Sequence, residues 1–421
     1  MSLTRLSVGE ASAHMLAGIS PVAEEERVDL RASLGRVLSR DVVSPVSLPP
    51  WDNASMDGFA VHAADIRGAS AKAPVRLRVV ETIAAGRRGT FALSEGAAVR
   101  IMTGAPVPRG ADSVVRVEDT GGGPDLVEIR DDRDAGANIR AAGEDVRAGA
   151  VVVRAGIILG AAHVGVLASV GYARAHVYRR PRVAIIATGD ELVPVEGFDE
   201  VLAGDRIVSS NTYSLAAAVR DAGGEAVQMV IAPDDPDAIA HCLGQAEGAD
   251  LILTSGGVSV GDFDYTRDVV ARLGGELTLW RVRMRPGAPL GFGRLFGAPW
   301  LGLPGNPVSA LVTFELFGRP LLRALAGATR PHRRAVPVVV DEPITLRAPL
   351  THFLRCVLEE GEDGTLHARL TGAQSSGMLT SMSSADALLI VPPEPAAVPA
   401  GTTLRALPLD GDLGGSDRFP A

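Results

Sequence analysis

The period at which apolar and polar positions alternate changes along the chain, and each change predicts a different architecture. From about residue 45 to about residue 150, short apolar runs alternate with turns and no helical period persists, which predicts a β-rich module. From 181 to 325, apolar strands alternate with amphipathic stretches of helical length, which predicts a parallel sheet with helices on both faces. From 335 to 409 the helical period is lost again, which predicts a small C-terminal barrel or sandwich.

Capping residues predict where individual helices begin. Ser7, with Glu10 three positions later, forms a capping box and predicts a helix near the N-terminus. Either Ser210 or Asn211 is expected to cap the next helix, and Gly223-Gly224 is expected to end it. A short helix is also expected at the start of residues 30–44, before an extended segment.

Four turns rich in glycine, proline and acidic residues follow strands of the expected sheet. They are 188–191 (TGDE), 233–235 (PDD), 255–264 (SGGVSVGDFD) and 303–309 (LPGNPVS). Ligands of such sheets bind beyond the carboxyl ends of the strands, so we expect the turns to share one site. A glycine-rich segment between a strand and a helix also presents backbone N–H groups to an anion. For the third turn, a tight βα connection with solvated acids is an equally good interpretation.

The polar groups on these turns are of two kinds. Carboxylates that meet at one edge need either a cation or raised pKa values to coexist, and oxygen ligands indicate Mg²⁺ rather than zinc. The carboxylates are Asp190, Glu191, Asp234, Asp235, Asp262 and Asp264. Backbone and hydroxyl groups suit phosphate. The residues that carry them are Ser255, Gly256, Gly257, Ser259, Pro304, Gly305, Asn306, Pro307 and Ser309.

Three arginines alternate with apolar residues between the third and fourth of these turns. On one strand, Arg281, Arg283 and Arg285 would all lie on the same face. That face would suit a polyanionic ligand, and a solvated edge strand explains the pattern equally well.

Composition narrows the class of protein. The net charge is −9 and aromatic residues make up only 4%, so neither a basic footprint nor a base-stacking platform for nucleic acid is expected. No apolar run reaches the ~18 residues of a membrane span, and the N-terminus lacks the apolar centre of a signal peptide, so we expect a cytoplasmic protein. Cys242 and Cys356 form no metal-binding pattern and are expected to be reduced. Without a nucleophile elbow or a Walker lysine, the residues indicate Mg²⁺-assisted chemistry at a phosphate or phosphoanhydride.

Several longer motifs resemble one enzyme family. They are PPWDNASMDGFAV (49–61), RIMTGAPVP (100–108), GED (143–145), ATGDEL (187–192), SGGVSVGDFDYT (255–266), RPGAP (285–289) and GLPGNPVSA (302–310). In this order they resemble the molybdopterin molybdenumtransferases of molybdenum cofactor biosynthesis, which are related to the C-terminal domain of gephyrin. The resemblance covers nearly the whole chain.

This resemblance implies an α/β multidomain protein of four regions. They are a helical connecting region (1–44 with 140–178), an elongated β-rich module (45–139), a molybdopterin-binding α/β domain (179–328) and a C-terminal β-barrel (329–421). It implies a homodimer whose active site lies between the α/β domain of one subunit and the β-rich module of the other. The adenylating enzyme of the preceding step and the molybdoenzymes are further expected partners.

The resemblance also implies a reaction and the residues that carry it. Adenylylated molybdopterin and molybdate would be the substrates, Mg²⁺ would assist cleavage of the pyrophosphate, and AMP would leave. The residues matched to catalytic positions are Asp57, Thr103, Glu191, Asp235 and Asp264, of which the last three would bind Mg²⁺ or the pterin, and Asp145 is a weaker match. The residues whose backbone and hydroxyl groups suit phosphate, with Arg281 and Arg285, would hold the substrate.

One position departs from the family pattern. The family commonly has KPGKP where this chain has RPGAP, so Ala288 replaces a lysine beside the expected oxyanion site. An arginine can hold an oxyanion through two hydrogen bonds, so Arg281 and Arg285 can preserve binding there. Two other functions are compatible with the motifs: molybdopterin adenylylation, which uses the same type of α/β domain, and a non-catalytic pterin-binding scaffold.

Overall fold

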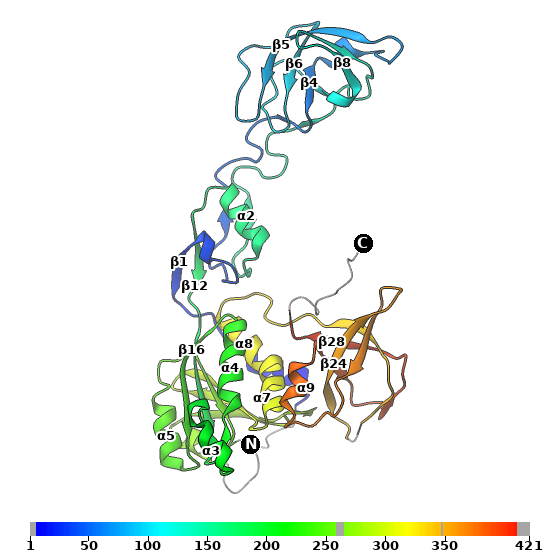
Figure 1. Cartoon of the computed structure of the whole chain (residues 1–421). Helices are drawn as coiled ribbons and strands as arrows, with labels where there is room; N and C mark the ends of the chain where they lie inside the picture. Colours follow the sequence, from blue (N-terminus) through cyan, green and yellow to red (C-terminus); the bar gives the residue numbers. More distant parts are fainter. Residues whose placement is uncertain (1–5, 258–264, 347, 411–421) are drawn as a thin grey trace. The chain divides into compact units, whose positions relative to one another are not determined.

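The computed structural model describes residues 6–257, 265–346 and 348–410, which form two compact units (Figure 1). The first unit comprises Met1–Arg40, Gly156–Gly160 and Arg174–Ala421, and the second comprises Asp41–Ala155 and Ala161–Ala173. Each unit has its own sheets and its own hydrophobic core.

A six-stranded sheet forms the centre of the first unit. Its strands are, in spatial order, β16 (Glu225–Ala232), β13 (Arg182–Thr188), β17 (Leu251–Ser255), β21 (Ala298–Leu303), β20 (Pro289–Leu295) and β18 (Glu276–Arg281). The expectation of a parallel sheet is correct for the first four strands, whereas β20 runs antiparallel to both of its neighbours, β21 and β18. The reason is the Phe296-Gly297 turn, whose two positive φ angles (52° and 81°) join β20 and β21 as a tight hairpin.

Helices cover both faces of this sheet (Figure 1). Side chains of β13 alternate between the faces, so Val183 and Ile185 pack on one side and Ala184 and Ile186 on the other. The first face is covered by α1 (Val8–Leu16), α4 (Ser210–Asp221), α7 (Pro307–Thr313), the π-helical turn η5 (Phe314–Gly318) and α8 (Arg319–Leu325). The second is covered by α5 (Pro236–Gly244) and α6 (Thr266–Arg272). Each fully buried Leu or Ile stabilises this core by about 1.5–3 kcal/mol.

Two of the predicted helix starts can be compared with the structure. The capping box at α1 is confirmed, because the Glu10 N–H donates to Ser7 Oγ and the Ser7 N–H donates to the Glu10 carboxylate. The predicted cap of α4, Ser210 or Asn211, is wrong by one or two residues, because the helix begins at Ser210 and Ser209 is the cap. Asn211 therefore lies in the first turn of α4, where its side chain is available for other contacts.

The C-terminal sheet of the first unit closes on itself. Its strands are β19 (Met284–Arg285), β24 (Thr351–Glu360), β25 (Leu366–Leu370), β22 (Val336–Val340), β28 (Thr403–Pro408) and β26 (Ala387–Val391), with a further pairing of β24 and β26. This confirms the predicted β-barrel. The short strands β23 (Ile344–Thr345) and β27 (Ala397–Val398) pair beside it, and α9 (Leu379–Ser383) precedes β26.

The expectation that three arginines share one strand face is wrong. Strand β18 ends at Arg281, and Arg285 belongs to β19 in the other sheet. The burial pattern changes at the same point: Leu279 is buried in β18, whereas the buried residues Val282 and Met284 occupy even-numbered positions, so the alternation shifts by one position. One regular strand could not bury Leu279, Val282 and Met284 on the same face. The chain therefore crosses from one sheet to the other there.

Smaller elements complete the first unit. They are β1 (Glu25–Asp29) paired with β12 (Arg174–Tyr178), the 3-10 turn η1 (Leu30–Ala32), β14 (Leu192–Val193) paired with β15 (Ile207–Val208), the 3-10 turn η4 (Val195–Gly197) and α3 (Phe198–Ala203). The short helix expected at the start of 30–44 is thus a single 3-10 turn. Gly35, with φ of 74°, ends the helical backbone there.

The second unit is built on a six-stranded sheet. Its strands are β7 (Ser113–Arg116), β4 (Gly58–Val61), β6 (Ala97–Ile101), β5 (Val75–Ile83), β9 (Leu126–Ile129) and β8 (Thr120–Gly122). The remaining elements are the pairs β2 (Val42–Val43) with β11 (Val151–Val153) and β3 (Asn53–Ala54) with β10 (Ile139–Arg140), the 3-10 turns η2 (Ala63–Ile66) and η3 (Val117–Asp119), and α2 (Ala161–Ser169). The predicted β-rich module is confirmed, because between residues 45 and 150, all of which are described, the only helical elements are these two 3-10 turns.

Candidate functional site

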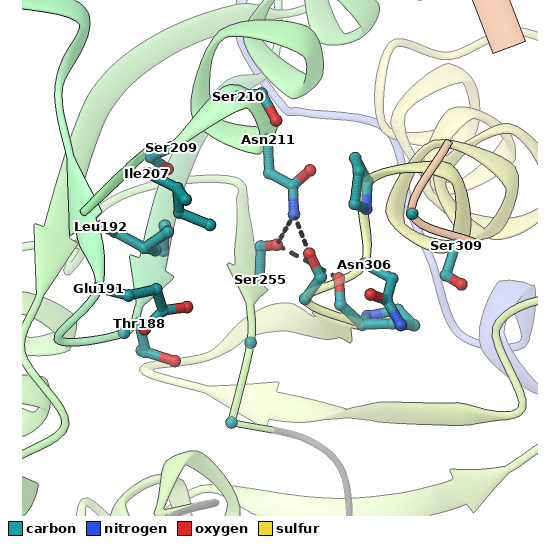
Figure 2. Close-up of a pocket in the computed structure, with 18 of the residues that line it drawn as sticks. Thr188, Glu191, Leu192, Ile207, Ser209, Ser210, Asn211, Ser255, Asn306 and Ser309 are labelled. Carbon is teal, nitrogen blue, oxygen red and sulfur yellow. Dashed lines mark hydrogen bonds between the residues drawn. The ribbon is translucent and has the colours of Figure 1, made fainter. Parts of the chain in front are cut away.

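A cavity of about 640 Å³ lies at the carboxyl ends of β13, β17 and β21, where the sequence predicts a site. Many of the predicted residues line it: Glu191, Ser255, Gly256, Gly257, Pro304, Gly305, Asn306, Pro307 and Ser309. Figure 2 shows Glu191 and Thr188 on one side of the cavity and Asn306 and Ser309 on the other. Turns distant in sequence therefore form a single site.

Asn211 joins two of these turns. Its Nδ2 donates to Ser255 Oγ at 2.8 Å and to the Gly305 carbonyl at 2.7 Å (Figure 2). The Ser255 hydroxyl in turn donates to the Pro304 carbonyl at 3.3 Å. The Asn211 Oδ1 is buried and has no hydrogen-bond partner among the described residues. The contacts fix the end of β17 against the 304–307 turn and leave one acceptor at the cavity wall.

The Gly256-Gly257 turn can be formed only by glycine. Both residues have positive φ, 97° and 65°. A Cβ at Gly256 would lie 2.7 Å from the Thr188 carbonyl oxygen, and one at Gly257 would lie 2.1 Å from Thr266 Oγ1. The backbone is therefore bare where it borders the cavity, as close binding of a ligand requires.

Two acidic turns meet beside this backbone. The Asp234 N–H donates to Asp190 Oδ1 at 3.1 Å, and Glu191 and Asp234 line the cavity. Asp235, predicted as a metal ligand, is the N-cap of α5, where its Oδ1 accepts hydrogen bonds from the N–H groups of Asp237 and Ala238. The predicted Asp262, Asp264 and Ser259 lie outside the described residues.

The carboxylates of the described part do not form a complete metal site. Among these residues, no three His, Cys, Asp or Glu side chains gather closely enough to hold a metal ion. Mg²⁺ needs fewer protein ligands, because it is commonly held by one or two carboxylates together with substrate phosphates and water. The oxygen donors Glu191 and Asp234 fit that mode of binding.

A second cavity, of about 850 Å³, adjoins the first. Pro289, Asn306 and Ser309 line both cavities. The second is also lined by Arg285 and Ala288, and from the barrel by His352, Arg355, Gln374, Ser375 and Ser376. The predicted Arg281 is among the lining residues of neither cavity.

Arg355 has the most unusual environment in the second cavity. Its side chain is 0% exposed and donates to the carbonyls of Ala373, Gln374 and Ser375 and to Ser381 Oγ. All these acceptors are neutral, and within the described ranges no carboxylate pairs with the guanidinium. Burial lowers the pKa of Arg355 from its ordinary value. A buried cation without a counter-ion favours binding of an anion.

Neither Arg355 nor Asn211 was predicted from the sequence as a site residue. Arg355 stands alone between Leu354 and Cys356 in an apolar strand, and such an isolated charge is a signal that could have been used. Asn211 carried only the signature of a helix cap.

Asp57 and Thr103 lie together in the second unit. Both the backbone N–H and the hydroxyl of Thr103 donate to Asp57 Oδ1 at 2.7 Å. These hydrogen bonds, the backbone one foremost, lower the pKa of Asp57 below its usual value. Asp145, the weaker match, is exposed, and its backbone N–H donates to the Leu48 carbonyl.

Comparison with known proteins matches all three parts of the chain to one family. Residues 6–171 match the MoeA N-terminal region (domain I and II), 184–324 match a probable molybdopterin binding domain, and 337–409 match the MoeA C-terminal region (domain IV). Within the described ranges, every helix is too short or too polar to cross a membrane.

Curated relatives match over almost their full length. Molybdopterin molybdenumtransferase 2 of Mycobacterium tuberculosis is 42% identical over 93% of this chain and 96% of its own length. Molybdopterin molybdenumtransferase of a Nostoc species is 36% identical over 92% of this chain and 89% of its own length. The solved structure of a molybdopterin biosynthesis moeA protein from Pyrococcus horikoshii superposes with a TM-score of 0.81 at 29% identity, covering 96% of this chain and all of that one. Together with the three matched regions, this confirms the expected fold class and shows that the chain belongs to the molybdopterin molybdenumtransferase family of transferases.

Proposed function

We propose that this protein inserts molybdenum from molybdate into adenylylated molybdopterin, with Mg²⁺-dependent release of AMP. One observation carries the proposal: two cavities of complementary chemistry adjoin at Pro289, Asn306 and Ser309. The first offers backbone groups, hydroxyls and carboxylates, and the second offers arginines. A pterin nucleotide and an oxyanion could therefore bind side by side.

The first cavity suits the pterin nucleotide. Bare backbone at Gly256 and Gly257 allows close approach of a pyrophosphate. The side chains of Asn306 and Ser309, which line this cavity, can form hydrogen bonds with a pterin. Glu191 and Asp234 would hold Mg²⁺, which neutralises charge on the pyrophosphate when it is bound.

The second cavity suits molybdate. Arg355 and Arg285 supply positive charge, and no Asp or Glu is among its described lining residues. The lysine expected from the family at Ala288 is absent, so the charge there must come from these arginines. Arg355 is the stronger candidate, because it is buried and has only neutral partners.

The reaction gives the first test. In the presence of Mg²⁺, AMP release from adenylylated molybdopterin should depend on molybdate, and the product should activate a molybdenum-free molybdoenzyme. Glu191→Gln should lower kcat/KM by about 100-fold or more, because a group acting on the transition state supplies a few kcal/mol. Asp199→Asn, which changes an exposed acid of α3 outside both cavities, is the matched control and should leave the rate within about twofold.

Other results would assign another function. If the protein made the adenylylated compound from ATP and molybdopterin, it would be an adenylyltransferase. Tight binding of the nucleotide with no AMP release, with or without molybdate, would indicate a pterin-binding scaffold.

We also propose a homodimer in which Asp57 and Thr103 of one subunit complete the site of the other. Asp57→Asn and Glu191→Gln should each inactivate the protein. When the two variants are co-expressed, half of the dimers are mixed, and each mixed dimer has one intact site. Activity should return to about a quarter of the wild-type value. An assay of the purified mixture measures this, and no recovery would show that each site is formed within one subunit.

A further inference from the structure

His352 is a buried histidine on the wall of the second cavity. Its side chain is 6% exposed, and its Nε2 lies 3.3 Å from the Ala348 carbonyl oxygen. Because a carbonyl only accepts hydrogen bonds, Nε2 carries the proton. In the neutral ring Nδ1 then carries no proton, and among the described residues the hydrogen bond of the ring is the one from Nε2.

Among the described residues that line the cavity with His352, the charged ones are two arginines. In register, His352 on β24 pairs with Arg285 on β19 and with Val391 on β26. Arg355, three residues along β24, lines the same cavity, and the segment that precedes β24 contributes the carbonyl of Ala348 and the apolar Leu350. No described lining residue is an acid. Burial lowers the pKa of His352 below its ordinary value; the hydrogen bond with the Ala348 carbonyl opposes this shift, and the charge of Arg285 adds to it.

We propose that His352 binds the oxyanion in this cavity and takes up a proton at Nδ1 when a tetrahedral dianion such as molybdate enters. This inference rests on the proposed function, since it concerns the cavity assigned to molybdate. Protonation makes His352 a third cationic group of the cavity, beside the two arginines. This third charge is present only when the anion is bound. The proton comes from solvent and returns to it when the anion leaves.

The sign of the pH dependence follows from the charges. In the free protein the imidazole is neutral at neutral pH, because burial foremost, together with the charge of Arg285, disfavours its charged form. A bound dianion favours the charged form and raises the pKa. As the pH rises from the free pKa to the bound pKa, affinity should fall by up to about tenfold per pH unit, and outside this window it should be constant.

Calorimetric titration of the full-length protein with molybdate tests the proposal without a variant. Sulfate serves as a second dianion, since its own charge does not change over this range. Affinity measured from about pH 5.5 to about pH 8.5 should fall with pH. Titrations in buffers of different ionisation enthalpy should show net proton uptake on binding.

His352→Gln, which keeps a hydrogen-bond donor but cannot be protonated, should abolish both the pH dependence and the proton uptake. His367→Gln is the matched control, because His367 lies on β25 of the same barrel, pairs with Asp341 and does not line the cavity. That variant should keep the wild-type pH profile.

A wild-type affinity that does not vary with pH, without proton uptake, would overturn the proposal, as would a pH profile that survives in His352→Gln. Absence of oxyanion binding at every pH would overturn it too. Molybdate-dependent AMP release is measured separately, so failure at His352 can be distinguished from failure of the proposed function. If His352→Gln does not fold, proton uptake by the wild type still decides the question.

Discussion

Replacing Arg355 by methionine should weaken molybdate binding by about 10- to 150-fold, because a hydrogen bond to a charged group contributes about 1.5–3 kcal/mol. The same change should lower the free energy of unfolding by about 2–4 kcal/mol, since three carbonyls and Ser381 Oγ lose their donor. Arg355→Lys should be intermediate, because lysine keeps the charge but not the planar set of donors. Calorimetry and urea unfolding measure the two effects.

Arg369 provides the matched control. It lies on the adjacent strand β25 and pairs with Glu359 at 2.7 Å, and its side chain is 55% exposed. Exposed ion pairs contribute little, so Arg369→Met should change stability by less than about 1 kcal/mol and leave molybdate affinity unchanged. If Arg355→Met bound molybdate as tightly as the wild type, the second cavity would not be the oxyanion site.

Features that depend on a few neighbouring residues could be predicted from the sequence. The capping box of α1 and the glycine turn after β17 follow from local geometry, and both are observed. The convergence of the four turns could be predicted as well, because in parallel sheets the carboxyl ends of the strands share one edge. Glu191, Gly256 and Ser309 therefore meet at one cavity, as expected.

Features that depend on distant parts of the chain could not be predicted. The second cavity combines residues near 285 and 309 with a barrel strand and the loop around 374, and no spacing in the sequence specifies that contact. Asp234, and not Asp235, lines the first cavity, because the carboxylate of Asp235 caps helix α5. After Arg281 the chain passes from one sheet to the other, because residues before and after this point are buried in different sheets. The alternation pattern of a single strand does not reveal such a change.

The second large effect is expected at Gly58, next to Asp57. Gly58 lies in β4 between β6 and β7, and a Cβ added to it would be 1.9 Å from the Val115 carbonyl oxygen. That oxygen belongs to backbone fixed in the sheet, so the strands would have to separate. Gly58→Ala should therefore destabilise the second unit by about 4 kcal/mol or more, which thermal unfolding would show as a lower melting temperature.

The same substitution elsewhere in this unit should have the opposite effect. Gly165 lies in helix α2, and a Cβ added to it would meet no atom within 4 Å. Alanine is favoured over glycine in a helix, so Gly165→Ala should stabilise the unit by about 0.5–1 kcal/mol. Because Asp57 directly precedes β4, Gly58→Ala should also release the Asp57–Thr103 contact and abolish AMP release, whereas oxyanion binding by the first unit should persist. An unchanged melting temperature in Gly58→Ala would show that β4 and β7 can separate at little cost, and loss of oxyanion binding would show that the first unit depends on the second.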